Sequence, residues 1–449
     1  MIRPALFILL IATLAASSVA WREHLQLDAQ AITVRKATIL ASENDTLRDA
    51  LQSAQQQASV AQNSVRRSQI EHDVAGIRDL PFSSPVVYDV LDRAGIREVV
   101  AGKLSAQYTD QQIEDMSTGL SAFGLLPPHF PLKQTYIDLL GEQVAAFYDQ
   151  HQHKLFMFQD ASLENAQNRV ILAHELTHAL QDQNFGLLNL PLEARDNDDR
   201  AAAASALVEG DATLVMSQYM QQDLTWKTFS DTVTYSVTQR MDQIRKAPHY
   251  LREMLVFPYI KGQQFCSAVF ARGGYAALSA VYANPPASTA QILHPEKYFP
   301  ETREDPIAVT FSDTALNGQK PLDDNVLGEM GCRILFDADG NPETADAVAA
   351  GWRGDHYLVY DEGGTLVWKS AWRSPQAAQA AAEAMRATVA HRFHLTFVKQ
   401  EDTITGFNPK PAHTVRIQVL PTNEVVFILT STEESTDPLF QQFAGASHG

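Results

Sequence analysis

The sequence predicts an α+β fold, and three observations support this expectation. Long stretches with helical periodicity recur along the chain, and three pairs of short apolar segments separated by turn residues read as β-hairpins. The composition, with 45% hydrophobic and 20% charged residues, is that of a globular protein and excludes a mainly disordered one. At about 100–200 residues per domain, a chain of 449 residues holds two or three domains.

The charge balance and the cysteine count exclude several classes of protein. Lys and Arg total 35 against 53 Asp and Glu, a net charge of −18 that would repel a phosphate backbone, so we expect no nucleic-acid partner. The two cysteines, Cys266 and Cys332, allow at most one disulfide or remain two buried thiols. A disulfide framework and a cysteine-rich metal site are therefore excluded.

The first twenty residues have the features of an export signal. A positive charge at Arg3 precedes an uncharged apolar run from Pro4 to Val19, and Ser18-Val19-Ala20 offers the small residues that a signal peptidase recognises. We expect residues 1–20 to be either a cleaved signal peptide, which is favoured, or an N-terminal anchor. Either outcome places the rest of the chain in the bacterial periplasm or outside the cell, with residues 4–20 anchored in the inner membrane if they are retained.

Residues 21–75 predict a helical stalk or linker. The segment is polar, and its apolar residues follow steps close to a heptad: Leu40, Leu47, Leu51, Ala54, Ala58, Ala61 and Val65. Because three of these are alanines, a strong coiled coil is not expected, and the alternative to a stalk is a simple solvated helix.

Residues 76–310 form the expected main domain. Helices are predicted at 86–104, 110–123, 163–182, 201–219, 229–245 and 261–282, and strands at 143–148 and 155–158. The prolines at 127–128 end the second helix, and the two strands form a hairpin that leads directly into the helix at 163–182.

Residues 311–449 form an expected C-terminal α+β lobe. Helices are predicted at 324–335, 342–350 and 376–393, with hairpins that pair 355–360 with 365–372 and 415–420 with 424–429.

The most informative motif is His174-Glu175-Leu176-Thr177-His178. On a helix, two histidines four residues apart lie on the same face, so both imidazoles can bind one Zn²⁺. Glu175 follows the first ligand and can deprotonate a water on the metal. The other residues from Val170 to Leu180 are uncharged, which predicts a buried helix that presents these polar groups to a metal. The alternative is a solvated helix with two ordinary histidines.

A catalytic zinc site usually has a third protein ligand, and Glu209 is the best candidate. It is the first acid to interrupt an alanine-rich helical run, and Gly210 after it permits the close approach of two helices. No further histidine motif follows His178, which excludes the metzincin pattern. The acids nearer in sequence, Asp182, Asp196, Asp198 and Asp199, are expected to be solvated, and the alternative for Glu209 is a carboxylate on a helix surface.

These motifs resemble the gluzincins, zinc peptidases whose third ligand is a Glu within an EGxA motif. Glu209-Gly210-Asp211-Ala212 matches that motif, and Pro258-Tyr259-Ile260-Lys261-Gly262 is similar to the PYxKG segment of gluzincin aminopeptidases. The resemblance implies that Tyr259 stabilises the oxyanion, with His294 or Tyr148 as the next candidates. It also implies a zincin-like, thermolysin-type domain over 76–310, mainly helical with a small sheet and an edge strand. Segments 142–149, 174–183 and 288–295 are similar to uncharacterised bacterial neutral zinc metallopeptidases.

The chain also departs from these families. The GAMEN segment that anchors substrates of the aminopeptidases is missing, which favours an endopeptidase. Thr213 stands where thermolysin-like enzymes have an orienting Asp, so Asp211 has either a different orienting role or none.

Together these features predict an exported zinc peptidase that hydrolyses peptide bonds in a peptide or protein by a metal-activated water. We expect one Zn²⁺ per chain on His174, His178 and Glu209, with Glu175 as general base and Tyr259 at the oxyanion. The strand at 155–158 is expected to be the edge strand that pairs with an extended substrate. The alternatives are a non-catalytic zincin-fold protein of envelope assembly or chaperoning, and a ligand-binding protein in which the histidine motif is coincidental.

Overall fold

The computed structural model describes residues 4–141, 146–159, 161–223, 246–337, 340–360, 364–400, 402–409, 412–431 and 436–444. The chain divides into two compact units, Met1–Ser68 and Gln69–Gly449. The second unit contains every residue that the sequence predicts for the metal site. The expected helix at 229–245 lies outside the described residues, as does the first part of the expected strand at 143–148.

The described residues of the first unit form a single helix, which agrees with the helix predicted over 21–75. Helix α1 spans Pro4–Arg78, and apolar side chains such as Leu40, Leu47 and Leu51 are exposed along it. The last turns of α1 belong to the second unit, where Ile70 and Val74 are buried. The structured unit thus begins before residue 76. A search of the described residues finds no helix with the length and apolar content needed to span a membrane.

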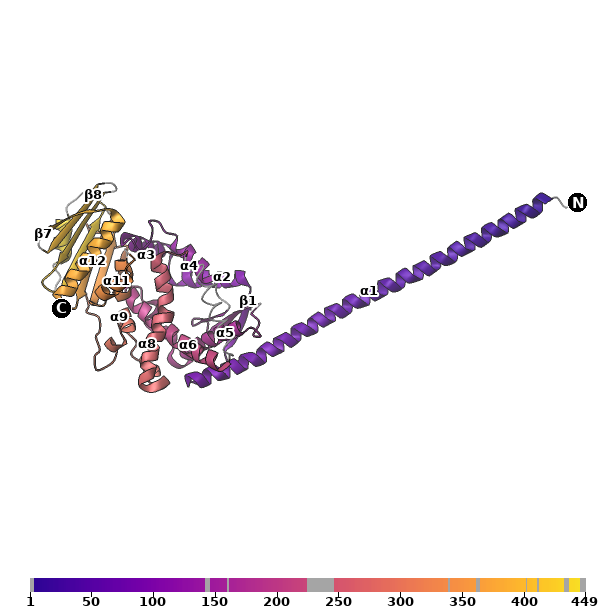
Figure 1. Cartoon of the computed structure of the whole chain (residues 1–449), viewed down its shortest axis with the longest axis horizontal. Coiled ribbons are helices and arrows are strands. Elements are labelled where there is room, and N and C mark those ends of the chain that lie inside the picture. The colour runs from indigo at the N-terminus through magenta and orange to yellow at the C-terminus, as the bar shows by residue number, and fades with distance from the viewer. Residues whose placement is uncertain are drawn as a thin grey trace. The chain divides into compact units, whose positions relative to one another are not determined.

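The first half of the second unit is mainly helical (Figure 1). Its longer helices are α2 (Arg93–Gln107), α3 (Asp110–Ala122), α4 (Leu132–Gly141), α5 (Ala166–Phe185), α6 (Asp198–Asp223) and α8 (His249–Val281). Short helical turns follow at Leu187–Asn189, Pro191–Glu193, Thr289–Leu293 (α9) and Pro295–Lys297. The strands are β1 (Val87–Leu91), β2 (Ala146–Asp149) and β3 (Lys154–Phe158).

The small sheet corrects two predictions. Its order is β1-β3-β2, with β1 parallel and β2 antiparallel to β3, so the strand expected at 155–158 lies in the centre and not at the edge. The predicted helix at 86–104 is also wrong at its start, because its first residues form β1. Asp92 caps the following helix by accepting a hydrogen bond from the Gly95 N–H at 2.8 Å, which fixes the change from strand to helix.

Helix α6 packs against both α5 and α8, and the predicted metal ligands lie on α5 and α6. A Cβ on Gly210 of α6 would lie 2.2 Å from the carbonyl carbon of Gly262 in α8, and one on Gly262 would lie 2.1 Å from the Ala206 oxygen. The glycine after Glu209 therefore does allow a close helix contact, but with α8 and not with the helix of the histidine motif. Helix α8 begins earlier than predicted and contains Pro258, so Tyr259 lies inside a helix and not at its start.

The second half of the unit is built on a seven-stranded sheet of order β4-β5-β6-β10-β9-β8-β7. The strands are β4 (Asp323–Asn325), β5 (Trp352–Tyr360), β6 (Thr365–Trp372), β7 (Thr396–Gln400), β8 (Thr403–Pro409), β9 (Ala412–Val419) and β10 (Glu424–Thr430). The helices are α10 (Gly328–Phe336), α11 (Pro342–Ala349), α12 (Pro375–Phe393) and α13 (Asp437–Ala444).

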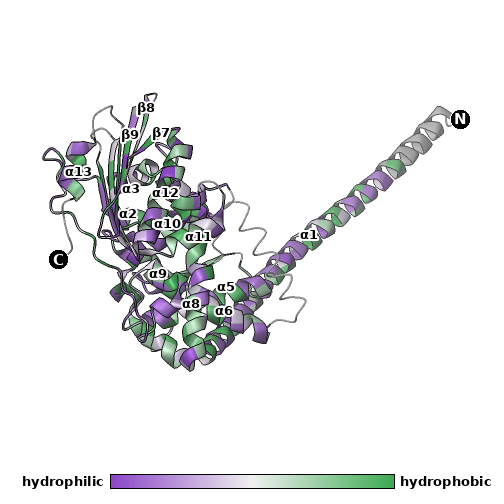
Figure 2. Ribbon diagram, turned by 60° about the vertical axis from the view of Figure 1, so that its left-hand side comes forward, coloured by the Kyte–Doolittle hydropathy of each residue, from purple (hydrophilic) through white to green (hydrophobic). Residues whose placement is uncertain are grey.

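The central strands of this sheet are covered on both faces. Figure 2 shows α12 and α13 on opposite sides of it. Along β5, Tyr357 and Val359 join the core that includes Met385 of α12, whereas Leu358 and Tyr360 pack with Phe443 of α13. Burial on two faces explains why β10 is apolar at almost every position and does not alternate with polar residues.

Both predicted hairpins of the lobe are present, and they pair in the expected way. The predicted helix at 324–335 is wrong at its start, because β4 occupies 323–325 and the helix begins at Gly328. Strands β7 and β8 and helix α13 were not predicted. The main hydrophobic core runs from Ile113 and Leu207 to Trp368 and Ile417, across the boundary expected at 310–311.

Candidate metal centre

Three predicted ligands meet in the second unit. His174 and His178 lie one turn apart on α5, and Glu209 reaches them from α6. The Nε2 atoms of the two histidines are 3.1 Å apart, and Glu209 Oε2 lies 3.1 Å from His174 Nε2 and 3.5 Å from His178 Nε2. Among the described residues, this is the group of His, Cys, Asp and Glu whose ligand atoms converge closely enough to hold an ion. Glu209 is thus not a carboxylate on an outer helix surface.

The donor set fits zinc. Two imidazole nitrogens and one carboxylate oxygen are the ligands of many catalytic zinc sites. With bonds of about 2.0–2.1 Å, a tetrahedral ion holds its ligand atoms about 3.3 Å apart, which is close to the three separations measured here. Both histidines are only 8% exposed, so a cation between them would remove the cost of burying facing nitrogen atoms.

The same three groups attract one another electrostatically. Burial by itself raises the pKa of Glu209, but the imidazoles of His178 and His174 outweigh it and hold that pKa well below its ordinary value. For His178, burial lowers the pKa, and the Glu209 carboxylate overcomes this and raises it to about 9. The Glu209 side chain is therefore an anion at neutral pH, as a metal ligand must be.

Glu175 is held beside the cluster by the small sheet. Its Oε2 accepts the backbone N–H of Tyr148 in β2 at 2.9 Å. Burial raises the pKa of the Glu175 carboxyl, with Glu209 adding to the effect and the two histidines opposing it. A raised carboxyl pKa suits a general base, because a proton taken up there can be passed on at neutral pH.

A second layer of polar side chains supports the ligands. The Nδ1 of His178 lies 2.9 Å from Gln181 Oε1, while Gln181 Nε2 donates to the Val208 carbonyl at 2.9 Å and to Asp211 Oδ2 at 3.2 Å. Asp211 also accepts the hydroxyl of Tyr282 at 2.8 Å. Asp211 thus contacts the side chain that lies against His178, which is consistent with the orienting role that the sequence left open.

Asp182 ties the β2–β3 hairpin to α5. Its Oδ2 accepts the Tyr148 hydroxyl at 2.7 Å and lies 2.7 Å from His153 Nδ1, and its Oδ1 accepts the Leu187 N–H at 3.0 Å. The expectation that Asp182 and Asp199 are solvated is wrong, because both are buried. Gln181 and Asp182 lie three and four residues after His178, so helical spacing alone would have placed both near the site.

The three candidates for the residue that stabilises the oxyanion have different surroundings. The Tyr259 ring lies 6.0 Å from the His174 ring, centroid to centroid, so it stands beside the cluster. His294 Nε2 is 2.6 Å from Glu329 Oε1, and the Tyr148 hydroxyl donates to Asp182. His294 and Tyr148 therefore each lie against a carboxylate, and Tyr259 is the candidate whose ring stands beside His174. The two cysteines are both buried free thiols.

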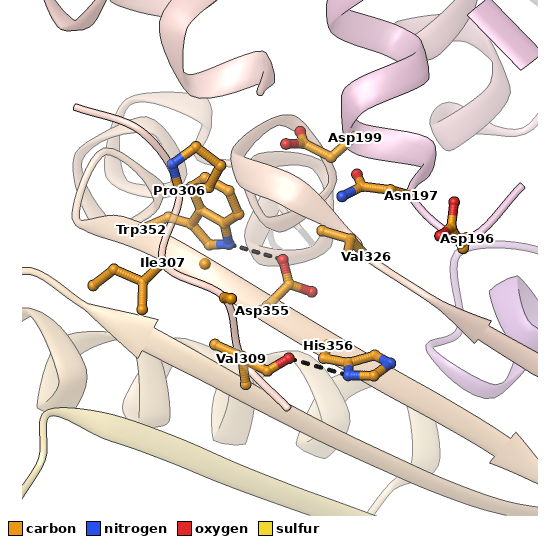
Figure 3. Close-up of a pocket in the computed structure, with 12 residues that line it drawn as sticks. Asp196, Asn197, Asp199, Pro306, Ile307, Val309, Val326, Trp352, Asp355 and His356 are labelled. Carbon is orange, nitrogen blue, oxygen red and sulfur yellow. Dashed lines mark hydrogen bonds between the residues drawn. The ribbon is translucent and has the colours of Figure 1, made fainter. Parts of the chain in front are cut away.

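A cavity of about 300 Å³ lies where the start of α6 meets β5 and the segment 306–309 (Figure 3). Its buried carboxylate, Asp355, accepts the indole N–H of Trp352 at 2.8 Å, and His356 Nδ1 lies 3.1 Å from the Val309 carbonyl. These polar groups are used to hold the fold, so we assign no reaction to this cavity.

Comparison with known proteins concerns only the sheet region. A domain family of unknown function (DUF8575) matches residues 317–438, from before β4 to the start of α13. No curated protein matches the chain. No solved structure matches it. The family match leaves out the histidine motif and Glu209.

Proposed function

We propose that this protein is an exported zinc-dependent peptidase of the gluzincin type, with a thermolysin-like domain around α5 and α6. The observation that carries the proposal is the convergence of His174, His178 and Glu209, with ligand atoms 3.1–3.5 Å apart. When bound there, Zn²⁺ would act as a Lewis acid on a peptide carbonyl and make a water molecule acidic enough to attack it.

The residues around the metal then have distinct roles. Glu175 takes the proton of the attacking water and passes it to the leaving amine. The Tyr259 hydroxyl donates a hydrogen bond to the oxygen on which negative charge develops, and it does so without carrying a charge itself. The hydrogen bond from the Tyr148 N–H keeps one oxygen of Glu175 in place, so the other is free to face the water.

The strand next to Glu175 supports binding of an extended peptide. In the described part of the chain, β2 pairs with β3 on one side only, and the Tyr148 N–H on its other side points at Glu175. A substrate added along that outer side would bring its backbone close to the general base. We therefore propose β2, and not β3, as the strand that aligns the substrate.

The proposal is tested by zinc content and by cleavage of an unstructured protein such as casein. Glu175→Gln keeps the shape of the side chain but removes the base, so we expect full zinc occupancy with turnover lower by about 10²–10⁴-fold or more. Glu164→Gln, on an exposed residue just before α5, is the matched control and should leave turnover unchanged.

The outcomes separate the alternatives. Stoichiometric zinc without cleavage of any peptide library would favour a non-catalytic zincin-fold protein. A purified protein that binds no zinc would favour a ligand-binding protein with a coincidental motif. Undiminished hydrolysis by Glu175→Gln would contradict the assigned mechanism.

A further inference from the structure

The last residue of the N-terminal helix is buried next to the candidate metal centre. Arg78 ends α1, and its side chain is fully buried, as is that of Asp211 in α6. The Arg78 Nε donates to both carboxylate oxygens of Asp211, at 2.9 and 3.0 Å. A further guanidinium nitrogen donates to Ser279 Oγ at 3.0 Å. The pair joins the last residue of α1, which belongs to the second unit, to the helix that carries Glu209.

The surroundings of Arg78 favour arginine over any other cation. The guanidinium lies 4.8 Å from the centre of the Tyr275 ring and 5.7 Å from that of Phe185. A planar cation can stack on such rings while it also donates in the plane to a carboxylate and a hydroxyl, whereas a lysine ammonium cannot do both. The contacts therefore hold the Asp211 carboxylate in one orientation.

From Asp211 the contacts lead directly to a metal ligand. The Gln181 amide donates to Asp211 Oδ2 at 3.2 Å and to the Val208 carbonyl at 2.9 Å. The two oxygens that Gln181 Nε2 contacts can only accept hydrogen bonds. The amide oxygen of Gln181 must therefore face the other way, toward His178 Nδ1 at 2.9 Å. An oxygen acceptor at Nδ1 fixes the proton there, and this leaves the Nε2 lone pair of His178 for the metal.

We propose that Arg78 is a positioning residue for the metal ligand His178 and acts on it through Asp211 and Gln181. This inference rests on the proposed metal centre. Arg78 orients the Asp211 carboxylate, which orients the Gln181 amide, which in turn sets the tautomer and ring angle of His178. The end of the N-terminal helix is therefore part of the support of the metal site, although it lies far from the histidine motif in sequence.

The inference is tested in the full-length protein by measuring the affinity for Zn²⁺ alone, in competition with a chromophoric chelator. Supporting partners of metal-bound histidines typically contribute about 10–100-fold in affinity, so we expect Arg78→Met and Gln181→Met each to weaken Zn²⁺ binding by about that factor. Both changes break the same chain of contacts. The double variant should therefore lose no more Zn²⁺ affinity than whichever single variant binds Zn²⁺ more weakly. Arg78→Lys keeps the charge and should recover part of the affinity.

A second pair of variants separates positioning from stability. Arg78→Met leaves Asp211 as a buried charge without its cation, which destabilises the fold. Arg78→Met/Asp211→Asn removes both charges, so we expect most of the folding stability to return while Zn²⁺ still binds about 10-fold more weakly. Lys369→Met is the matched control, because it breaks the equally buried Lys369–Glu424 pair of the large sheet, and it should lower stability without changing the Zn²⁺ affinity of the folded protein.

The outcomes distinguish this inference from the proposed function. Wild-type protein that binds no Zn²⁺ would overturn the metal centre, and the role of Arg78 with it. Wild-type binding together with unchanged affinity in folded Arg78→Met, or in Arg78→Met/Asp211→Asn, would overturn the role of Arg78 alone. The role of Arg78 would also be overturned if the fold-loss of Zn²⁺ affinity in Arg78→Met/Gln181→Met equalled the product of the two single losses. The two residues would then act separately.

Discussion

The two halves of the second unit use buried polar side chains in different ways. In the sheet region, Asp355 is surrounded by four donors at 2.8–2.9 Å, two backbone N–H groups and two indole N–H groups. In the helical region, the Nε2 atoms of His174 and His178 face each other and one carboxylate oxygen. Both sites are buried, but only the first is complete without a ligand.

This difference separates a structural polar cluster from a candidate site. The four donors of Asp355 satisfy the lone pairs of its carboxylate, and this cluster holds the start of α10 against β5. Two imidazole nitrogens and a carboxylate that converge on one point instead have the donor set of a metal site, and we propose that a cation completes them. Burial alone would not have distinguished them, and the following changes test whether the contrast holds.

The largest effect is expected from His178→Ala. Removing one of two imidazoles leaves a single histidine and a carboxylate, which is too few ligands for tight binding, so zinc content should fall from one ion per chain to none. The matched change His356→Ala removes a histidine of the sheet region that is paired with Asp324, and it should leave the zinc in place. Elemental analysis of the dialysed proteins measures both, and stoichiometric zinc in His178→Ala would show that the ligand set is wrong.

Tyr259→Phe should lower kcat by about 10²–10³-fold, because one donor to the oxyanion is worth on the order of 3 kcal/mol in the transition state. KM and zinc content should change little, since the ground-state carbonyl needs the hydroxyl far less. His294→Asn is the control, because His294 lies against Glu329. If Tyr259→Phe changed kcat only about twofold while His294→Asn reduced it strongly, the oxyanion role would belong to His294.

Asp355→Asn should affect stability without affecting the metal. The new amide group would direct its own N–H groups at indole or backbone donors, so we expect the free energy of unfolding to fall by about 2–4 kcal/mol. Zinc bound per folded molecule should stay at the wild-type value. Chemical denaturation measures the first quantity, and a loss of zinc from folded Asp355→Asn would mean that the two regions are not independent.

The last expected effect is a pH dependence of stability at Asp199. Burial raises the pKa of this carboxyl from 3.8 to about 7, with Asp355 and Glu329 adding to the shift and hydrogen bonds from Thr289 opposing it. Between about pH 4 and pH 7 the folded state keeps a proton that the unfolded chain has lost, so this contribution to stability is full below pH 4 and declines as the pH rises.

Asp199→Asn should remove the contribution of Asp199 to the change of the free energy of unfolding with pH. This slope is at most about 1.4 kcal/mol per pH unit for one proton. The free energy of unfolding, measured in urea at several pH values across this window, tests it. Identical slopes in the variant and the wild type would mean that Asp199 is already ionised in the folded protein.

Several elements could be predicted because their signal is local. The prolines after α3, the Asn-capped helix α5, and the hairpin of β9 and β10 each depend on residues close in sequence, and the structure has them within a few residues of the expected bounds. The pattern at β1 predicts a helix because its apolar residues fit a helix as well as a strand over so short a length. Strand β4 is Asp323-Asp324-Asn325 and carries no apolar residue that could indicate a strand. The prediction of β3 as an edge strand is wrong because β1 pairs with the side of β3 opposite β2, and the sequence predicts a helix over β1.

By itself the sequence determined that His174 and His178 share one face of a helix, since their spacing places both there whatever surrounds them. It also indicated Glu209 through its position in an apolar helix. Only the tertiary structure decided that Glu209 meets the histidines, that β2 and not β3 lies beside Glu175, and that Arg78 lies beneath the site. These facts depend on contacts between helices and strands far apart in the chain, and no local pattern of residues encodes which surfaces will pack together.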